Sequence, residues 1–142
     1  MQNKITYEKL FTLVEKLKST NDPKRKYEYI LWLGKKLKSP RDDVLIDKNK
    51  VKGCVSEVFV KANFIKGRLY WEGHSDALIT KGLLSFLITG LNDLSPIDVI
   101  NLNEEFLDET GLKISLTPSR ANGFLNILLK MKSQANDFLS SQ

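Results

Sequence analysis

The chain has 142 residues, of which 42% are hydrophobic and 27% are charged, and this balance is typical of one globular domain. It has one cysteine and one histidine, which excludes an internal disulfide and a structural zinc site built from Cys and His ligands. No apolar run approaches the ~18 residues of a membrane-spanning helix, and residues 1–10 lack the apolar core of a secretory signal. We therefore expect one domain over residues 1–142, no membrane partner and a reducing compartment.

The net charge of +5 is distributed unevenly along the chain. Residues 1–53 carry 14 Lys/Arg against 7 Asp/Glu, whereas residues 54–142 carry 8 against 10. A basic N-terminal third can meet nucleic acid or an acidic protein surface. Its lysines, such as Lys16, Lys35 and Lys36, fall on the polar sides of helical patterns, which is typical of a solvated face. The aromatic strand signature of an RNA-binding sheet is absent, so we expect no nucleic-acid partner.

Two amphipathic helices are predicted in the N-terminal part. Thr6 is the expected cap of the first, and Asp22 followed by Pro23 marks the start of the second. The second should end before Pro40, because the residue ahead of a proline is disfavoured in a helix. The first helix is expected to bury Leu10, Leu13, Val14 and Leu17, and the second Tyr27, Ile30, Leu31, Gly34 and Leu37.

Two short strands are predicted in the middle of the chain. The first covers residues 55–60 and leads toward Ile65, and the second covers residues 68–73. Lys66-Gly67 between them can turn the chain, and a tight turn indicates an antiparallel pair. On the second strand, either Leu69 and Trp71 or Tyr70 and Glu72 face the core.

The C-terminal half of the chain is predicted to be helical. Ser75 or Asp76 is the expected cap of a third helix, and Gly82 inside it indicates a close approach of this helix to the sheet. Its apolar face is Leu78, Ile79, Leu83, Phe86 and Leu87. Ser95-Pro96 starts a short fourth helix, and a further turn over residues 103–110 stops at Gly111.

The last part of the chain is predicted to hold a brief extended piece and a long helix. Residues 114–116 are expected to be extended, and Thr117-Pro118 opens the helix. Its buried face is Phe124, Ile127, Leu128, Met131, Ala135 and Phe138. With helices at both ends and strands between them, we predict an α+β fold, in which helices pack on one face of a small, mainly antiparallel sheet.

The single cysteine, Cys54, lies directly after Gly53, where a loop enters the first strand. Most free cysteines are small buried hydrophobes. Glycine, however, permits a bent backbone, and Lys50 and Lys52 are positive charges of the kind that lowers a thiol pKa. The residues alone leave two readings open, an inert core thiol and a thiolate that accepts a group covalently. Without a second cysteine, any sulfur exchange must be completed by another molecule.

A second hypothesis is a stand-alone cysteine hydrolase or transferase, with Cys54 as nucleophile, His74 as base and Asp76 orienting the imidazole. It requires the imidazole within hydrogen-bond reach of the thiol, and the sequence does not fix that distance. The alternative is a surface histidine followed by a helix-capping aspartate. The patterns GxxxxGK[ST], GxGxxG and GxSxG are all absent, which argues against the common nucleotide-binding and serine-hydrolase sites.

Four segments in order match one known pattern of motifs. They are KYEYILWLG (26–34), VKGCVSEV (51–58), GHSDALITKGL (73–83) and LTPSRANG (116–123). These segments resemble the SufE family, the sulfur-acceptor partners of cysteine desulfurases, over nearly the whole chain. The resemblance implies an α+β fold similar to that of the IscU scaffold.

The resemblance also implies a role for Cys54. The matching cysteine takes sulfur as a persulfide from a desulfurase of the SufS or CsdA type, stimulates that enzyme, and passes the sulfur to an iron–sulfur scaffold of the SufBCD type. The pyridoxal phosphate belongs to the partner, so no cofactor, no metal and no independent turnover are expected in this chain. The residues implied at the loop and the partner contact are Lys52, Gly53, Val55, Ser56, Asp76 and Arg120.

The implied setting is the bacterial cytoplasm, with the plastid stroma as the second option. The sequence leaves open which desulfurase is the partner, whether the chain forms a homodimer, and whether the sulfur goes only to iron–sulfur clusters. Residues 93–109 contain six acids and no lysine or arginine. This acidic segment and the basic N-terminal region are expected either to select the desulfurase or to keep the protein soluble.

Overall fold

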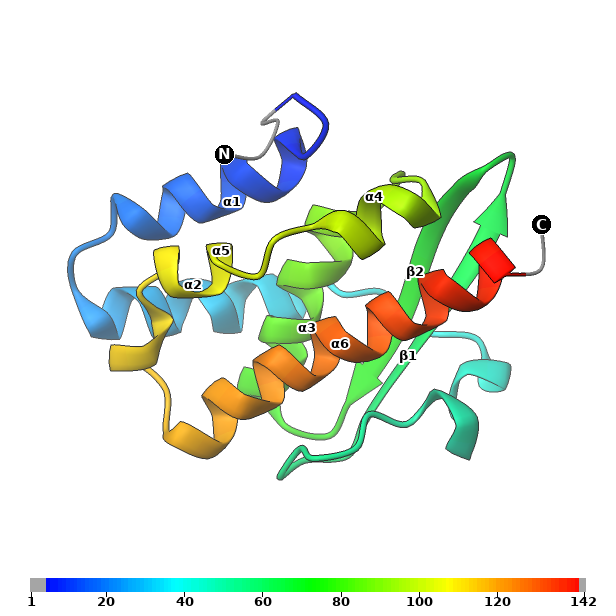
Figure 1. Cartoon of the computed structure of the whole chain (residues 1–142). Helices are drawn as coiled ribbons and strands as arrows, with labels where there is room; N and C mark the ends of the chain where they lie inside the picture. Colours follow the sequence, from blue (N-terminus) through cyan, green and yellow to red (C-terminus); the bar gives the residue numbers. More distant parts are fainter. Residues whose placement is uncertain (1–4, 141–142) are drawn as a thin grey trace.

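The computed structural model describes residues 5–140, which contain six α-helices, three 3-10 helices and a two-stranded sheet (Figure 1). In Figure 1 the hairpin lies at the right, and the last helix crosses the front of the molecule beside it. The α-helices are α1 (Glu8–Lys18), α2 (Pro23–Lys35), α3 (Leu78–Leu91), α4 (Pro96–Asn101), α5 (Phe106–Glu109) and α6 (Pro118–Ser140). The other elements are η1 (Asp42–Val44), η2 (Asp47–Asn49), η3 (Leu112–Ile114), β1 (Val58–Ile65) and β2 (Arg68–Ser75).

The two strands form the antiparallel hairpin that the sequence predicts, with Val58 opposite Ser75 and Ile65 opposite Arg68. Lys66 and Gly67 both have positive φ, +50° and +81°, as a two-residue turn between twisted strands requires. Strand β1 begins at Val58, however, and not at Val55 as predicted. Residues 51–57 instead form a loop, which we call the Cys54 loop.

Helices cover this hairpin, and the α+β prediction is confirmed. Leu69 and Trp71 are the core-facing pair of β2. The outer edge of β1 is paired by a side chain of α6, because Ala62 N donates to Gln134 Oε1 at 2.7 Å and Gln134 Nε2 donates to Val60 O at 2.7 Å. A glutamine used in this way satisfies backbone groups that an open strand edge leaves unpaired. None of the helices within residues 5–140 is long and apolar enough to cross a membrane.

Helix starts were predicted with mixed success. Asp22 caps α2 and Ser95 caps α4, each accepting a hydrogen bond from a backbone amide of the first turn. The prediction for Thr6 is wrong, because α1 begins at Glu8 with Tyr7 in the cap position. The prediction for α3 is also wrong, because Ala77 occupies its cap position. Asp76 uses its carboxylate elsewhere, on the Cys54 loop.

Several expected faces differ in detail from the structure. Tyr27 is 36% exposed and Leu78 is 73% exposed, although both were assigned to buried faces. Lys26 is buried in place of Tyr27, and its ammonium donates to Leu17 O at 2.6 Å and to Thr110 O at 2.9 Å. It thereby satisfies carbonyl groups at the ends of α1 and α5, which explains a buried lysine. Residues 112–114 form η3, so the extended piece predicted at 114–116 is not present there.

Helices α2 and α3 approach each other at two glycines. A Cβ added to Gly82 would lie 2.1 Å from Ile30 O, and one added to Gly34 would lie 2.9 Å from Gly82 N. Both distances are too short for a side-chain carbon, so only glycine permits this crossing. The expected close approach at Gly82 is present, but the expectation that a strand is the neighbour is wrong, because Gly82 meets Ile30 of α2.

We predict that Gly82→Ala lowers the free energy of unfolding by about 2 kcal/mol, because overpacking a tight contact outweighs the better helix propensity of alanine. Urea unfolding followed by far-UV circular dichroism measures the change. Lys81→Ala, the neighbouring position on α3, is the control and is expected to stay within about 0.5 kcal/mol of the native chain. A Gly82→Ala variant as stable as this control would contradict the packing argument.

Candidate functional site

The Cys54 loop is closed at its base by a backbone hydrogen bond in which Val51 N donates to Val58 O at 2.8 Å. Gly53 has a φ of +79°, a conformation that favours glycine. A Cβ at this position would also lie 2.6 Å from Asn126 Nδ2 of α6. The positive φ therefore favours glycine before the cysteine, and a larger residue there would have to push the Asn126 amide aside.

Helix α6 covers one side of the thiol. Cys54 is half-buried, and its Sγ lies 3.7 Å from Gly123 O. A Cβ on Gly123 would lie 3.5 Å from this sulfur, so a glycine there leaves room for the thiol. One turn further along α6, Asn126 Nδ2 donates to Gly53 O at 2.9 Å. The thiol is thus held against the helix surface rather than inside the core.

Arg120 connects three elements around the loop. Its guanidinium donates to Ser56 Oγ in the loop and, at 2.7 Å, to Thr80 Oγ1 in α3. Thr80 is buried and also donates to Ser56 Oγ at 3.4 Å. Arg120 itself lies in the first turn of α6, where its amide donates to Thr117 Oγ1 at 3.3 Å. The predicted residues Ser56 and Arg120 are therefore in direct contact.

Asp76 fixes the far end of the loop. Its carboxylate accepts a hydrogen bond from Glu57 N at 3.0 Å, and Asp76 N donates to Glu57 O at 3.3 Å. The Glu57 side chain forms an ion pair with Lys50 at 3.5 Å. This pair joins the two ends of the loop across its base. Asp76 therefore contacts the Cys54 loop directly, through the backbone of Glu57.

The electrostatics of Cys54 differ from the sequence expectation. Burial raises the pKa of the thiol, and the positive charge of Arg120 opposes that rise with a smaller effect. The lowering of the thiol pKa expected from Lys50 and Lys52 is not present, because burial dominates. Burial thus favours the protonated thiol over the thiolate in this conformation.

The remaining predicted residues lie on the outside of the loop. Val55 is 70% exposed, and Lys52 and Gly53 are exposed as well. An exposed valine beside a half-buried cysteine is a small apolar contact point on an otherwise polar loop. The sequence reasoning missed Gly123, Asn126 and Thr80. Two of them lie inside the segments 73–83 and 116–123, which is the only signal that pointed to them.

The proposed cysteine–histidine triad is not assembled in the part of the chain that the structure describes. His74 lies on β2 opposite Phe59, and the hydrogen-bond acceptor of Cys54 is a backbone carbonyl. The carboxylate of Asp76 binds the Glu57 amide and does not orient an imidazole. Likewise, residues 5–140 contain no cluster of three His, Cys, Asp or Glu side chains that could hold a metal ion.

Comparison with known proteins decides the family. The sequence model of the SufE family, described as an Fe-S metabolism associated domain, matches residues 11–135. The chain belongs to the SufE family. The chain is 45% identical to an uncharacterized SufE-like protein of Synechocystis, over 94% of this chain and 84% of that protein.

Other relatives are longer than this chain. It is 38% identical to SufE-like protein 1, chloroplastic/mitochondrial, of Arabidopsis thaliana over 89% of its residues, but it spans only 34% of that protein. It is 37% identical to cysteine desulfuration protein SufE of Plasmodium falciparum over 92% of its residues and 58% of the relative.

The solution structure of a hypothetical protein from Thermus thermophilus has a TM-score of 0.80 at 26% identity, covering 93% of this chain and 96% of that one. The fold is thus shared by a SufE-family chain and an independently solved protein.

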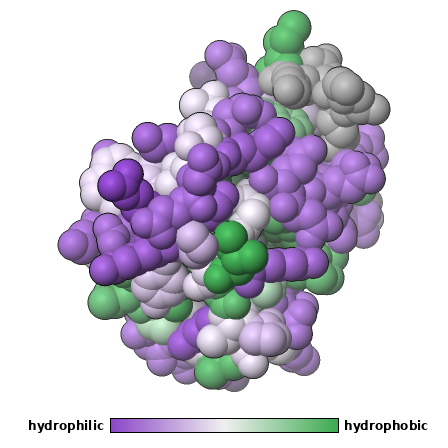
Figure 2. Space-filling view, turned by 90° about the vertical axis from the view of Figure 1, so that its left-hand side faces the viewer, coloured by the Kyte–Doolittle hydropathy of each residue, from purple (hydrophilic) through white to green (hydrophobic). Residues whose placement is uncertain are grey.

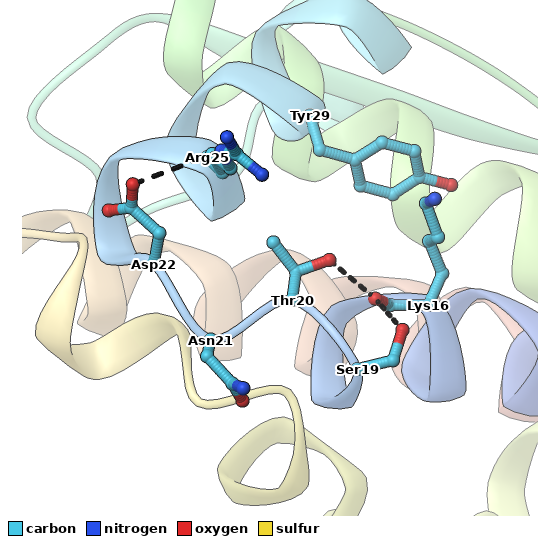
Figure 3. A pocket seen from close by; sticks show the side chains of 7 residues that line it. All are labelled: Lys16, Ser19, Thr20, Asn21, Asp22, Arg25 and Tyr29. Atoms are coloured by element: carbon cyan, nitrogen blue, oxygen red, sulfur yellow. Dashed lines mark hydrogen bonds and ion pairs between the residues drawn. The ribbon is translucent and has the colours of Figure 1, made fainter.

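A polar hollow at the α1–α2 connection is not part of this site (Figure 3). Its arginine and two of its hydroxyls are already engaged, since Arg25 pairs with Asp22 at 4.0 Å and the hydroxyls of Ser19 and Thr20 donate to Lys16 O. Figure 2 shows this end of the molecule as mostly hydrophilic, with hydrophobic side chains in small separate groups. The hollow therefore offers no grouping of reactive side chains.

We predict that Asn126→Ala speeds alkylation of Cys54 by iodoacetamide about threefold to tenfold. The lost hydrogen bond to Gly53 O contributes about 0.5–1.5 kcal/mol to the resting loop position, and its loss raises the population of the exposed thiol by that factor. The rate is measured by intact mass. Asn122→Ala, an exposed position one turn earlier on α6, is the control and should react like the native chain. Equal rates for both variants would show that Asn126 does not hold the loop.

We also predict a shifted pH profile for Cys54. Alkylation requires the thiolate, and burial raises the thiol pKa, so the rate should rise at higher pH in the folded protein than in the same chain unfolded in urea. Arg120→Gln removes the bonds that hold the loop as well as the charge, and because burial is the larger cause of the raised pKa, release of the loop should move the midpoint down toward that of the unfolded chain. Arg120→Lys keeps the charge and one donor and should stay closer to the native midpoint. A native midpoint below that of the unfolded chain would contradict the assignment.

Proposed function

We propose that this protein is a sulfur acceptor, which takes persulfide sulfur from a pyridoxal-phosphate cysteine desulfurase onto Cys54 and delivers it to iron–sulfur cluster assembly. The observation that carries the proposal is the position of the only cysteine. Cys54 lies on a loop with exposed neighbours, held to α6 by a few polar contacts, in a chain of the SufE family. The names of the Plasmodium relatives, cysteine desulfuration protein SufE, support the same role.

The transfer is a thiol–disulfide type of exchange. The thiolate of Cys54 attacks the outer sulfur of the donor persulfide, and the sulfur–sulfur bond of the donor breaks. A new sulfur–sulfur bond forms on Cys54, and the donor cysteine leaves as a thiolate that takes up a proton. One sulfur atom moves and no external oxidant or reductant is consumed. The same step, with Cys54 now the donor, passes the sulfur to the next thiol.

The resting geometry fits a carrier that reacts only when docked. A half-buried, protonated thiol reacts slowly with small oxidants. The Cys54 loop reaches its partner by leaving α6, which breaks the bonds made by Asn126 and Arg120. Opening the loop exposes the sulfur, removes the burial that raises its pKa and prepares it for attack. Binding to this opened form is the proposed route by which the chain stimulates the desulfurase.

The partners in this proposal are a desulfurase of the SufS or CsdA type and, downstream, a scaffold of the SufBCD type. The proposed compartment is the bacterial cytoplasm, and the name of the Arabidopsis relative shows that similar chains occur in organelles. The pyridoxal phosphate lies in the partner, so this chain supplies the acceptor thiol and the surface that presents it.

We predict that incubation with a cysteine desulfurase and cysteine adds the mass of one sulfur atom to the chain, and that dithiothreitol removes it. Peptide mapping should place the added sulfur on Cys54. Cys54→Ser should gain no sulfur and should fail to stimulate alanine formation by the desulfurase, while still binding it. His74→Ala should behave like the native chain. Loss of sulfur acceptance in His74→Ala, or acceptance by Cys54→Ser, would overturn the proposal.

A further inference from the structure

A groove lies beside the Cys54 loop, between the segment that leads into the loop and the middle of α6. Its volume is about 510 Å³. The lining residues that matter for its chemistry are Lys48, Lys50, Lys52, Lys130, Asn126 and Leu129. We call it the lysine groove. Three of its lysines precede Cys54 at alternate positions, so the groove continues directly into the loop that carries the thiol.

The groove is positively charged. Within the described part of the chain, no carboxylate lies within ion-pair distance of Lys48 or Lys52, and both side chains belong to exposed residues. Lys50 pairs with Glu57, and the ammonium of Lys130 donates to Lys48 O at 2.8 Å. Among the lining residues, Asp47 is the one acid. An excess of unpaired ammonium groups in a concave site attracts an acidic ligand.

The groove also has features that favour a protein segment. Leu129 is 43% exposed and lies among the lysines, where it offers an apolar contact to a side chain. None of the lining residues in the described chain is aromatic, so the groove lacks the stacking surfaces by which single-stranded nucleic acids are bound. An acidic polypeptide with an apolar residue matches this mixture of charge and exposed leucine better than a nucleic acid does.

Asn126 links the groove to the loop. Its side-chain amide lines the groove and at the same time holds Gly53 O, the carbonyl directly before Cys54. A ligand that bonds to this amide, or displaces it, removes one of the contacts that keep the loop on α6. Occupation of the groove and release of the thiol are therefore coupled through a single side chain.

We propose that the lysine groove docks an acidic segment of the sulfur donor, and that this docking frees the Cys54 loop through Asn126. The inference rests on the function proposed above and adds to it the chemistry of the partner surface. Because Lys48 and Lys52 are exposed, their charges should act mainly on the rate and salt dependence of encounter. The sulfur transfer itself depends on the thiol and proceeds once the partners have met.

The test compares two charge-reversed variants. In Lys48→Glu/Lys52→Glu the groove loses its unpaired cations, and in Lys24→Glu/Lys66→Glu the same charge change is made at exposed positions outside it. Both are titrated with a purified pyridoxal-phosphate cysteine desulfurase and cysteine, with the added sulfur on Cys54 read by intact mass. Matching circular dichroism spectra show that both variants are folded.

The groove variant is expected to need about tenfold more desulfurase for half-maximal sulfur uptake, and to reach the native level at saturation. The control variant should follow the native curve, and added salt should weaken uptake by the native chain more than by the groove variant. If the native chain gains no sulfur, the proposed function fails and this inference with it. If the native chain gains sulfur and the groove variant matches the control, only the groove assignment is overturned. Unchanged uptake combined with groove-dependent binding of a labelled single-stranded oligonucleotide would also overturn it.

Discussion

The resting position of the Cys54 loop depends on Arg120, because this one side chain joins the loop, α3 and α6. In the described structure its side-chain partners are the hydroxyls of Ser56 and Thr80 and not carboxylates, so its charge is not cancelled by a close ion pair. That charge opposes the rise in the pKa of Cys54 that burial causes. A hydrogen bond to a charged group contributes about 1.5–3 kcal/mol. Release of the loop therefore requires a few kcal/mol, an amount that a docking partner can supply.

One face of α6 provides both the rigid and the releasable contacts. Gln134 completes the edge of β1, while Arg120, Gly123 and Asn126 contact the Cys54 loop at spacings of three residues. Such spacing places side chains on the same side of a helix. The helix is thus fixed to the sheet at one end and holds the loop at the other. Val51 at the start of the loop belongs to the apolar core and Cys54 packs against it, so the part of the loop that can leave α6 without disturbing the core begins after Val51.

The sequence was sufficient for the features that depend on neighbouring residues. Asp22 and Ser95 predict helix starts, and Lys66-Gly67 predicts the hairpin turn, because capping and turn formation depend on residues only two or three positions apart. Some local predictions failed, and the contacts that build the site join distant parts of the chain. Thr6 has the right chemistry for a cap but lies one residue outside the position that the structure uses. The contact between Gly53 and Asn126 joins residues 73 positions apart, which no local periodicity reveals. Only the resemblance to a family placed Arg120 and Asp76 near the thiol.

The direction of the pKa shift of Cys54 shows that the position of the thiol against α6 decides its reactivity. Lys50 and Lys52 suggest a lowered thiol pKa when only the sequence is read, yet burial against α6 raises it. An acidic partner in the lysine groove would neutralise nearby cations and, by that effect alone, raise the thiol pKa further. Exposure of the sulfur lowers the thiol pKa, because it removes the effect of burial, which is larger than the effect of the positive charge. Docking therefore activates the thiol only if it moves the loop. A partner that merely binds the lysines without displacing Asn126 would leave Cys54 protonated and covered.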